Sequence, residues 1–242
     1  MHSVLIVKAD QLYAEALRDL VLGVFPSAVV KLAHTIESAS RAFADEMFDL
    51  LVTGLGASLG GDMLDFILDC TDRPRHRPRV LVVTTHREPR VVSALRTLPI
   101  QGVFDATTDQ RDKFRQAVVA VAGGGRYWSP AFGIPTETAG TPHDPFSNVL
   151  TTAEQMILSV IGDGCDDETA AARLALRAST IATVRRSLHR KLRLQHRGEL
   201  VRFAAQSGFV RFTPSGVLRT GFRMLTTAHW SRKTKPSRLA VA

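Results

Sequence analysis

A run of short polar and cationic side chains between residues 179 and 191 is the part of this sequence best suited to contact nucleic acid. One helical face, which begins with small residues and continues with arginines, carries Ser179, Ala182, Thr183, Arg186 and Arg190, and it is flanked by Arg185 and Lys191. Small side chains let a helix approach base edges closely, and arginine binds guanine edges or phosphates. The DNA-contacting residues predicted from this pattern are Ser179, Thr180, Ala182, Thr183, Arg185, Arg186, Arg190 and Lys191.

The opposite face of the same helix predicts burial. Apolar side chains recur there at helical spacing, at Ile181, Val184, Leu188 and Leu192. On charge pattern alone, an ordinary amphipathic helix with a solvated basic face fits equally well, because charge runs often serve only to solvate a surface. The elements before this helix decide between the two interpretations.

Two shorter helices are predicted upstream. Thr151 and Glu154 have the spacing of a capping box, and Gly162 and Gly164 are suited to end that first helix. The acids of residues 166–168 favour a second helix start, and a short turn at 175–177 leads into the cationic helix. Two helices joined by a tight turn, with a cationic second helix, describe a helix-turn-helix.

Residues 149–212 resemble the LuxR-type DNA-binding domain in register. The matching features are Leu150-Thr151 with Glu154, Gly164, Ala171 to Leu174, Thr180-Ile181, Lys191-Leu192, His196-Arg197 and Glu199-Leu200. The resemblance implies a four-helix domain whose last helix supplies the dimer contact through Glu199, Leu200, Phe203 and Ala204. The family often has lysine where this chain has Ala182 and histidine where it has Val184, so its sequence preference cannot be carried over.

Charge is concentrated in the second half of the 242-residue chain, which is long enough for two domains. Residues 1–128 are neutral overall and 129–149 carry −2, whereas 150–212 carry +4 and 213–242 carry +6, for a net charge of +8. This distribution is the footprint expected for polyanion binding. The two distant cysteines fit a reducing cytosol, and no apolar run is long enough to span a membrane.

The first half alternates apolar strands with helices. Strands are predicted at 3–8, 28–33, 48–55, 79–85 and 102–104, and helices at 11–23, 36–46, 61–70, 89–97 and 110–122. Buried strands alternating with helices imply a doubly wound parallel sheet, with ligand sites at the carboxyl edge of the strands. We therefore expect an α/β domain over 1–125, a proline-rich linker over 126–148, the helix-turn-helix domain over 149–212 and a basic tail over 213–242, with a short helix near 217–228.

This domain order resembles NarL/FixJ-type response regulators, on the strand segments VLIVKAD, FDLLVTGL, VLVVTTH and QGVFDAT. The resemblance implies a (βα)5 receiver domain that accepts a phosphoryl group on an aspartate, with Mg²⁺ held by two further acids. Those positions fall here on Lys8 and Ala9 for the acid pair, Gly54 for the acceptor, Thr84 for the hydroxyl and Ala106 for the lysine. Of these five positions, only Thr84 has the residue type that the family has there.

Glycine at the acceptor position has no nucleophilic oxygen, and an ammonium in place of an acid repels Mg²⁺. The sequence therefore predicts a receiver that is not phosphorylated by the usual route. Such a domain could serve as a constitutive dimerisation unit, bind a ligand or partner, or act as a spacer. The arginine cluster over 73–79 suggests an anion-binding site, but it falls in a loop away from the carboxyl edge, and a solvated loop is the preferred interpretation.

The sequence thus predicts a cytoplasmic DNA-binding transcription regulator that is not an enzyme and needs no metal or cofactor. Its expected partners are double-stranded DNA, a second copy of the chain, and RNA polymerase or another regulator, without a membrane. The alternative is a protein-interaction adaptor that binds another regulator through its first domain, which the loss of lysine at Ala182 favours.

Overall fold

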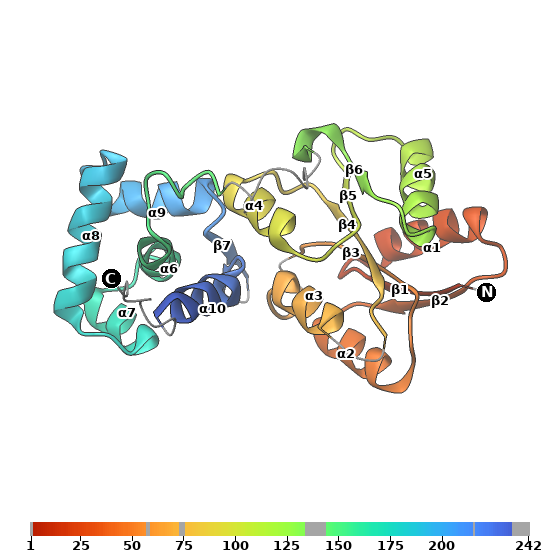
Figure 1. Ribbon diagram of the computed structural model, residues 1–242, viewed down its shortest axis with the longest axis horizontal. Coiled ribbons are helices and arrows are strands. Elements are labelled where there is room, and N and C mark those ends of the chain that lie inside the picture. The colour runs from red at the N-terminus through yellow and green to blue at the C-terminus, as the bar shows by residue number, and fades with distance from the viewer. Residues whose placement is uncertain (1, 57–58, 73–75, 134–143, 215, 234–242) are drawn as a thin grey trace, which may run out of the picture.

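The computed structural model describes residues 2–56, 59–72, 76–133, 144–214 and 216–233. They form an α/β domain and a mainly helical domain that lie side by side (Figure 1). Part of the predicted linker (134–143), the end of the predicted tail (234–242) and part of the arginine cluster (73–75) lie outside the described residues.

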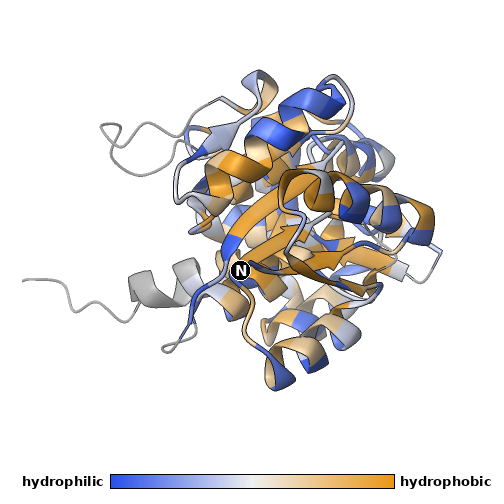
Figure 2. Cartoon of the chain, turned by 90° about the vertical axis from the view of Figure 1, so that its right-hand side faces the viewer, coloured by the Kyte–Doolittle hydropathy of each residue, from blue (hydrophilic) through white to orange (hydrophobic). Residues whose placement is uncertain are grey.

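The first domain is built on a parallel sheet in the order β2-β1-β3-β4-β5-β6. Its strands are β1 (Ser3–Val7), β2 (Val29–Ala33), β3 (Leu50–Thr53), β4 (Arg79–Thr84), β5 (Gly102–Asp105) and β6 (Tyr127–Trp128). The central strands are mostly apolar because both faces of the sheet are covered (Figure 2). The predicted doubly wound α/β fold is confirmed.

Helices cover the sheet in two layers. One face packs against α1 (Gln11–Val24) and α5 (Arg111–Ala122), and the other against α2 (Ile36–Asp45), α3 (Met63–Thr71) and α4 (Pro89–Thr97). Alternate β1 residues divide between the layers, with Leu5 on the second and Ile6 on the first. Because the strands are parallel, their carboxyl ends lie together at one edge of the sheet.

A sixth strand extends the first domain beyond the predicted boundary at residue 125. Strand β6 pairs in parallel with β5, and a short 3-10 helix η2 (Pro130–Phe132) buries Phe132 completely in the sheet core. Residues 127–132, predicted as linker, therefore belong to the domain, because burial of a phenylalanine outweighs the local proline and glycine signals.

The second domain contains α6 (Thr152–Ile161), α7 (Asp167–Leu174), α8 (Ala178–Leu192) and α9 (Arg197–Gln206). Helix α6 begins with the predicted capping box, in which Thr151 and Glu154 exchange hydrogen bonds. The turn between α7 and α8 places Ala175 in the left-handed region at φ 52°. All four predicted helices are present.

The segment predicted as the start of a basic tail is folded. Strands β7 (Val210–Thr213) and β8 (Gly216–Arg219) form an antiparallel hairpin, and α10 (Phe222–Lys233) packs against α6. Leu225 of α10 is buried in the same core as Ile157 and Leu188. The second domain thus extends to residue 233, beyond the predicted limit at 212.

Candidate nucleic-acid interface and the edge of the first domain

Helix α8 lies at the end of the molecule farthest from the sheet (Figure 1). Ile181 and Leu188 are fully buried and Val184 and Leu192 are partly buried, as the apolar stripe predicts. Because that stripe faces the domain core, the opposite face of α8 points to solvent. The structure therefore leaves the predicted contact face accessible.

The exposed face carries Ser179, Thr180, Thr183, Arg186 and Arg190. The Arg186 guanidinium lies back along the helix, donating to the Ala182 carbonyl at 3.3 Å and to the Thr183 hydroxyl at 3.3 Å. Both bonds are long and exposed, so a phosphate or a guanine edge can replace them at low cost. Ala182 is partly buried beside them.

Two of the predicted contact residues are engaged within the domain. Arg185 donates to both oxygens of Asp167, at 3.0 and 2.7 Å, and this forked pair fastens α8 to the start of α7. The hydrogen bonds from Arg185 lower the pKa of Asp167. Lys191 Nζ donates to Glu154 Oε2 at 2.7 Å. Both cations therefore help to fix the orientation of α8.

The Glu154 side chain bonds to residues at the start of α6 and on α8, and the contacts with α8 could not be predicted from the capping-box motif. Besides capping α6, its carboxylate accepts from Lys191 and from the Ser187 hydroxyl at 3.0 Å. Burial acts to raise the pKa of Glu154, but the bonds from Lys191, Thr151 and Ser187 hold it below its usual value. One carboxylate thus joins the start of α6 to the cationic helix.

The residues predicted for the dimer contact differ in accessibility. Leu200 and Ala204 are fully buried in the core of their own chain, and they offer no surface to a second copy. Phe203 packs edge-on against Phe146, and Glu199 caps α9 through the amides of residues 195 and 196. A contact through Leu200 and Ala204 is therefore not proposed below.

The five receiver positions lie in a row at the carboxyl edge of the sheet, because β1, β3, β4 and β5 are successive neighbours. Lys8 and Gly54 fit each other closely. A Cβ atom added at Gly54 would lie 2.7 Å from Lys8 Nζ, so the lysine occupies the space that a side chain at this position needs. The structure thus pairs the absence of a side chain at residue 54 with the presence of a cation at residue 8.

The environment of Lys8 combines an aromatic face with one acid. Its ammonium lies 4.2 Å from the centroid of the Tyr13 ring. Burial lowers the pKa of Lys8 to about 8, and the charge of Asp10 partly opposes this shift. The Asp10 carboxylate itself caps α1 by accepting from the Tyr13 amide at 2.7 Å.

Farther along the same edge, an ion pair between an exposed arginine and a buried carboxylate joins the segments after β4 and at the end of β5. Arg87 donates to the carboxylate of Asp105, which is fully buried and also accepts from the Thr107 amide and the Thr108 hydroxyl. Burial acts to raise the pKa of Asp105, but these bonds and the Arg87 charge hold it below its usual value. Thr84 accepts from the His86 amide at 3.0 Å, and Ala106 is partly buried nearby.

The second domain docks on this edge through its hairpin. Arg211 of β7 donates to the Leu55 carbonyl at 2.6 Å and lies 2.9 Å from His86 Nε2. His86 Nδ1 in turn lies 3.1 Å from Glu88, an arrangement that fits a neutral imidazole accepting from Arg211. One arginine therefore contacts the loops after both β3 and β4.

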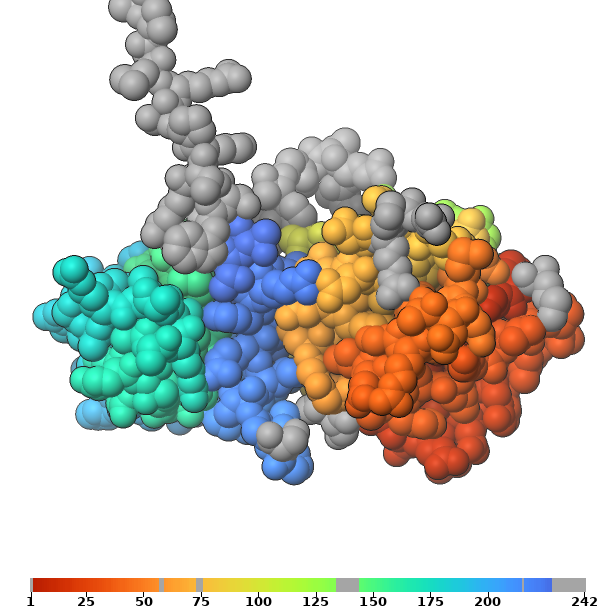
Figure 3. All heavy atoms as spheres, turned by 90° about the horizontal axis from the view of Figure 1, so that it is seen from below, coloured from red at the N-terminus to blue at the C-terminus, as the bar shows by residue number. Residues whose placement is uncertain are grey.

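The seam between the domains continues along α3 and α4. Gly221 donates from its amide to Asp62, the N-cap of α3, and its carbonyl accepts from Arg90 at 3.0 Å. Space-filling atoms of the C-terminal hairpin and α10 lie against the first domain along this line (Figure 3). The interdomain contact could not be predicted from motifs, because none of these residues belongs to one.

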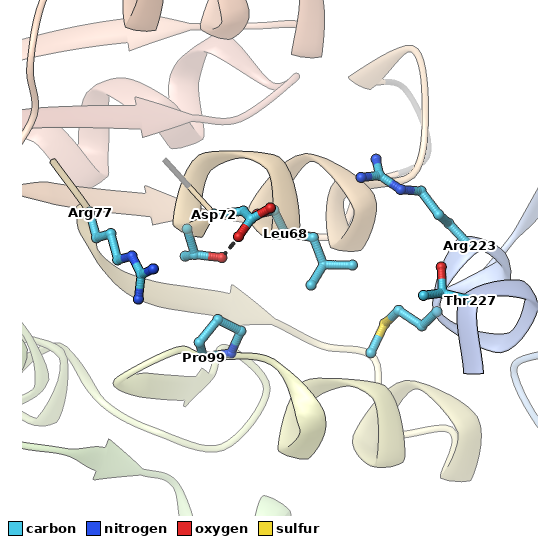
Figure 4. Close-up of a pocket in the computed structure, with 8 residues that line it drawn as sticks. Leu68, Asp72, Arg77, Pro99, Arg223 and Thr227 are labelled. Atoms are coloured by element: carbon cyan, nitrogen blue, oxygen red, sulfur yellow. Dashed lines mark hydrogen bonds between the residues drawn. The ribbon is translucent and has the colours of Figure 1, made fainter. Parts of the chain in front are cut away.

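An open cavity of about 560 Å³ lies at the same seam, between α3, the chain before β4 and α10 (Figure 4). Arg77 and Pro99 line one side, and Arg223 and Thr227 line the other. Arg223 forms an ion pair with Asp69 at 2.6 Å, which gives its guanidinium a partner within the chain. Among the described members of the arginine cluster, Arg77 lines this cavity.

The domain order, the six-stranded parallel sheet and the helix-turn-helix together define the fold of a two-component response regulator with a LuxR-type second domain. Solved structures with this fold include the RcsB–DNA complex, at TM-score 0.54 and 17% identity over 85% of this chain and 98% of that chain. RcsB from Salmonella enterica serovar Typhimurium bound to promoter rprA matches at TM-score 0.54 and 19% identity over 84% of this chain and 98% of that chain. These similarities confirm the resemblance predicted from the sequence.

Among curated proteins, the transcriptional regulatory protein MctR of Rhizobium johnstonii is 29% identical over 134 residues. The match covers 54% of this chain and 60% of that relative's length. No family model matches the chain. Within the described part of the chain, no helix is both long and apolar enough to cross a membrane.

Proposed function

We propose that this chain is a DNA-binding transcription regulator rather than an enzyme, and that α8 enters the major groove. The supporting observation is the solvent-facing surface of α8, on a fold shared with RcsB, whose solved structures include DNA complexes. Arg186 is the principal base reader in this proposal, with Ala182 and Thr183 close to base edges. Ser179, Thr180 and Arg190 approach the backbone, and Arg185 and Lys191 add positive charge while they orient the helix.

Two copies act together in this proposal. RcsB dimers have been solved on DNA, and a two-fold dimer reads inverted half-sites. The partner contact is assigned to the outer surface of α9, with Glu199 and Phe203. RNA polymerase or another regulator is the expected protein partner, and action on nucleoid DNA places the protein in the bacterial cytoplasm.

The first domain works without aspartyl phosphorylation in this proposal. Gly54 offers no oxygen to a phosphoryl donor, and the Lys8 ammonium stands where Mg²⁺ would need an acid. Incubation of the full chain with acetyl phosphate and Mg²⁺, followed by intact-mass measurement, should show no phosphoryl adduct. An adduct mapped by peptide analysis to the loops after β1 or β3 would refute this part of the proposal.

The DNA-binding part is tested by in-vitro selection of duplexes with untreated full-length protein, which should yield an inverted repeat. Arg186→Ala should then weaken binding to the selected site by about 1–3 kcal/mol and relax preference at one base pair in each half-site. Arg115→Ala, which removes the same charge from an exposed position on α5, is the matched control and should bind normally. Equal affinities for the two variants would exclude Arg186 as the base reader.

A protein-interaction adaptor is the second candidate. It is favoured by the ion pairs of Arg185 with Asp167 and Lys191 with Glu154, which leave fewer cations on α8 for phosphates. An adaptor would enrich no duplex over random competitor in the selection and would retain another regulator through its first domain. A reproducible consensus would rule the adaptor out as the main function.

A further inference from the structure

A small cavity lies at the carboxyl end of β1, next to the place where Lys8 meets Gly54. Its volume is about 390 Å³, within the range of small-molecule sites, and it is lined by Lys8, Ala9, Asp10, Tyr13 and Gly56. Lys8 and Tyr13 are both partly buried, and both line this opening. The cavity therefore presents one cation, one aromatic ring and a short stretch of backbone.

Within the described part of the chain, the Lys8 ammonium has no oxygen acceptor. Among the residues that the structure describes, no hydrogen bond or ion pair to Lys8 Nζ is found, although an ammonium has three donors to satisfy. His34 bonds to the Lys8 carbonyl and therefore fixes only the backbone. The Tyr13 ring face contributes a weaker attraction than an oxygen acceptor, so the partly desolvated cation favours an incoming anion.

Asp10 decides what kind of anion fits. Its carboxylate is close enough to Lys8 to act on the charge of the ammonium, yet it is held by the start of α1. Among the described lining residues Lys8 is the one cation and Asp10 the one acid, so the carboxylate of Asp10 offsets part of the attraction that a second negative charge on the ligand would gain from Lys8. The Tyr13 ring and the Ala9 methyl group supply an apolar wall for a short organic body.

We propose that this cavity is a binding site for a small organic monocarboxylate, whose carboxylate is recognised by Lys8 and whose apolar part packs on Tyr13. The site occupies the edge at which the resemblance places phosphoryl chemistry, but it recognises its ligand by charge and without covalent transfer. Gly56 lines the cavity, and its neighbour Leu55 accepts the hydrogen bond from Arg211. An occupant therefore lies beside the loop that the second domain contacts.

Binding should be measured by calorimetry on the full chain without DNA, with butyrate as the probe and inorganic phosphate and butylamine as comparison compounds. Butyrate should bind more tightly than phosphate, and butylamine should not bind. Lys8→Gln should weaken butyrate binding by about tenfold or more, because a bond to a charged group is lost. Lys31→Gln is the matched control, because Lys31 lies on β2 and pairs with the exposed Glu46. The Lys31→Gln variant should bind butyrate normally.

Two further measurements separate ion recognition from a general loss of structure. Asp10→Asn keeps a good N-cap and removes the repelling charge, so it should tighten butyrate binding and reduce the preference over phosphate. In protein labelled at lysine Cε, butyrate should raise the pKa of Lys8 above about 8, and affinity should fall as pH rises through that value.

The proposal is overturned if butyrate does not bind, if Lys8→Gln binds it as well as Lys31→Gln does, or if phosphate binds more tightly than butyrate. Because no DNA is present, these outcomes are independent of whether the protein regulates transcription.

Discussion

Replacement of Glu154 tests whether one carboxylate organises the second domain. The side chain is buried, with 8% of the residue exposed, and it accepts bonds from Thr151, Ser187 and Lys191. The change removes the carboxylate half of the capping box but leaves the Thr151 cap in place, and bonds to a charged group are worth roughly 1.5–3 kcal/mol each before compensation. Because Lys191 is one-third exposed and water replaces part of its bond, we expect Glu154→Ala to lower the free energy of unfolding by about 2–4 kcal/mol.

The measurement is urea unfolding followed by the fluorescence of Trp230, which lies in α10, in a background where Trp128 is replaced by phenylalanine. Glu154→Gln is the graded control, because it keeps a neutral hydrogen-bonding group and should lose about half as much stability.

The folded-state pKa of Glu154 is lowered, so its charge stabilises the fold above the unfolded pKa of about 4.3. This contribution is lost as pH falls through the folded value. The free energies of unfolding of the wild-type protein and of Glu154→Gln should therefore converge as the pH falls into the acid range. A loss below about 0.5 kcal/mol for Glu154→Ala at neutral pH would refute the reasoning.

Three further changes test the other contacts. Arg211→Ala should raise amide hydrogen exchange around Leu55 by about tenfold or more, because the hairpin loses its bond to that carbonyl, and unchanged exchange would show that the contact does not hold the domains. Gly54→Asp should form an ion pair with Lys8 and remain without a phosphoryl adduct after acetyl phosphate treatment, as checked by intact mass. Deletion of residues 234–242, which contain two bases, should reduce the salt slope of DNA binding by about 2 at most, whereas a slope unchanged within error would exclude the tail from the interface.

The strongest sequence signals were those in which periodicity and end signals agree. The central strands are continuous apolar runs such as FDLLVTGL, and the Thr151–Glu154 box marks the start of α6 from two residues alone. The predicted elements of both domains are found with boundaries that shift by a few residues at most. In these regions local preference and tertiary packing favour the same structure.

The missed elements are those in which long-range contacts outweigh the local signal. Strand β6 is two residues long and follows three glycines, so only its pairing with β5 and the burial of Phe132 reveal it. The helix predicted near 217–228 is present but begins later, at Phe222, because residues 216–219 pair as β8 and contact with α6 through Leu225 sets the place of α10. The partners of Arg211 are 125 and 156 residues away along the chain, a distance over which single-sequence patterns carry no pairing information.

The Lys8–Gly54 pair explains why the edge of the first domain can be altered without loss of its fold. A lysine in that place needs the volume of the missing side chain, and a glycine there leaves a gap that the lysine fills. The same loop is then held from the other side, because Leu55 directly follows Gly54 and accepts from Arg211 of the second domain. Arg211 also contacts His86, in the loop where Thr84 accepts a backbone bond. The loops after β3 and β4 are therefore both contacted by one arginine of the second domain, and an occupant of the Lys8 cavity would lie beside a loop that this arginine already holds.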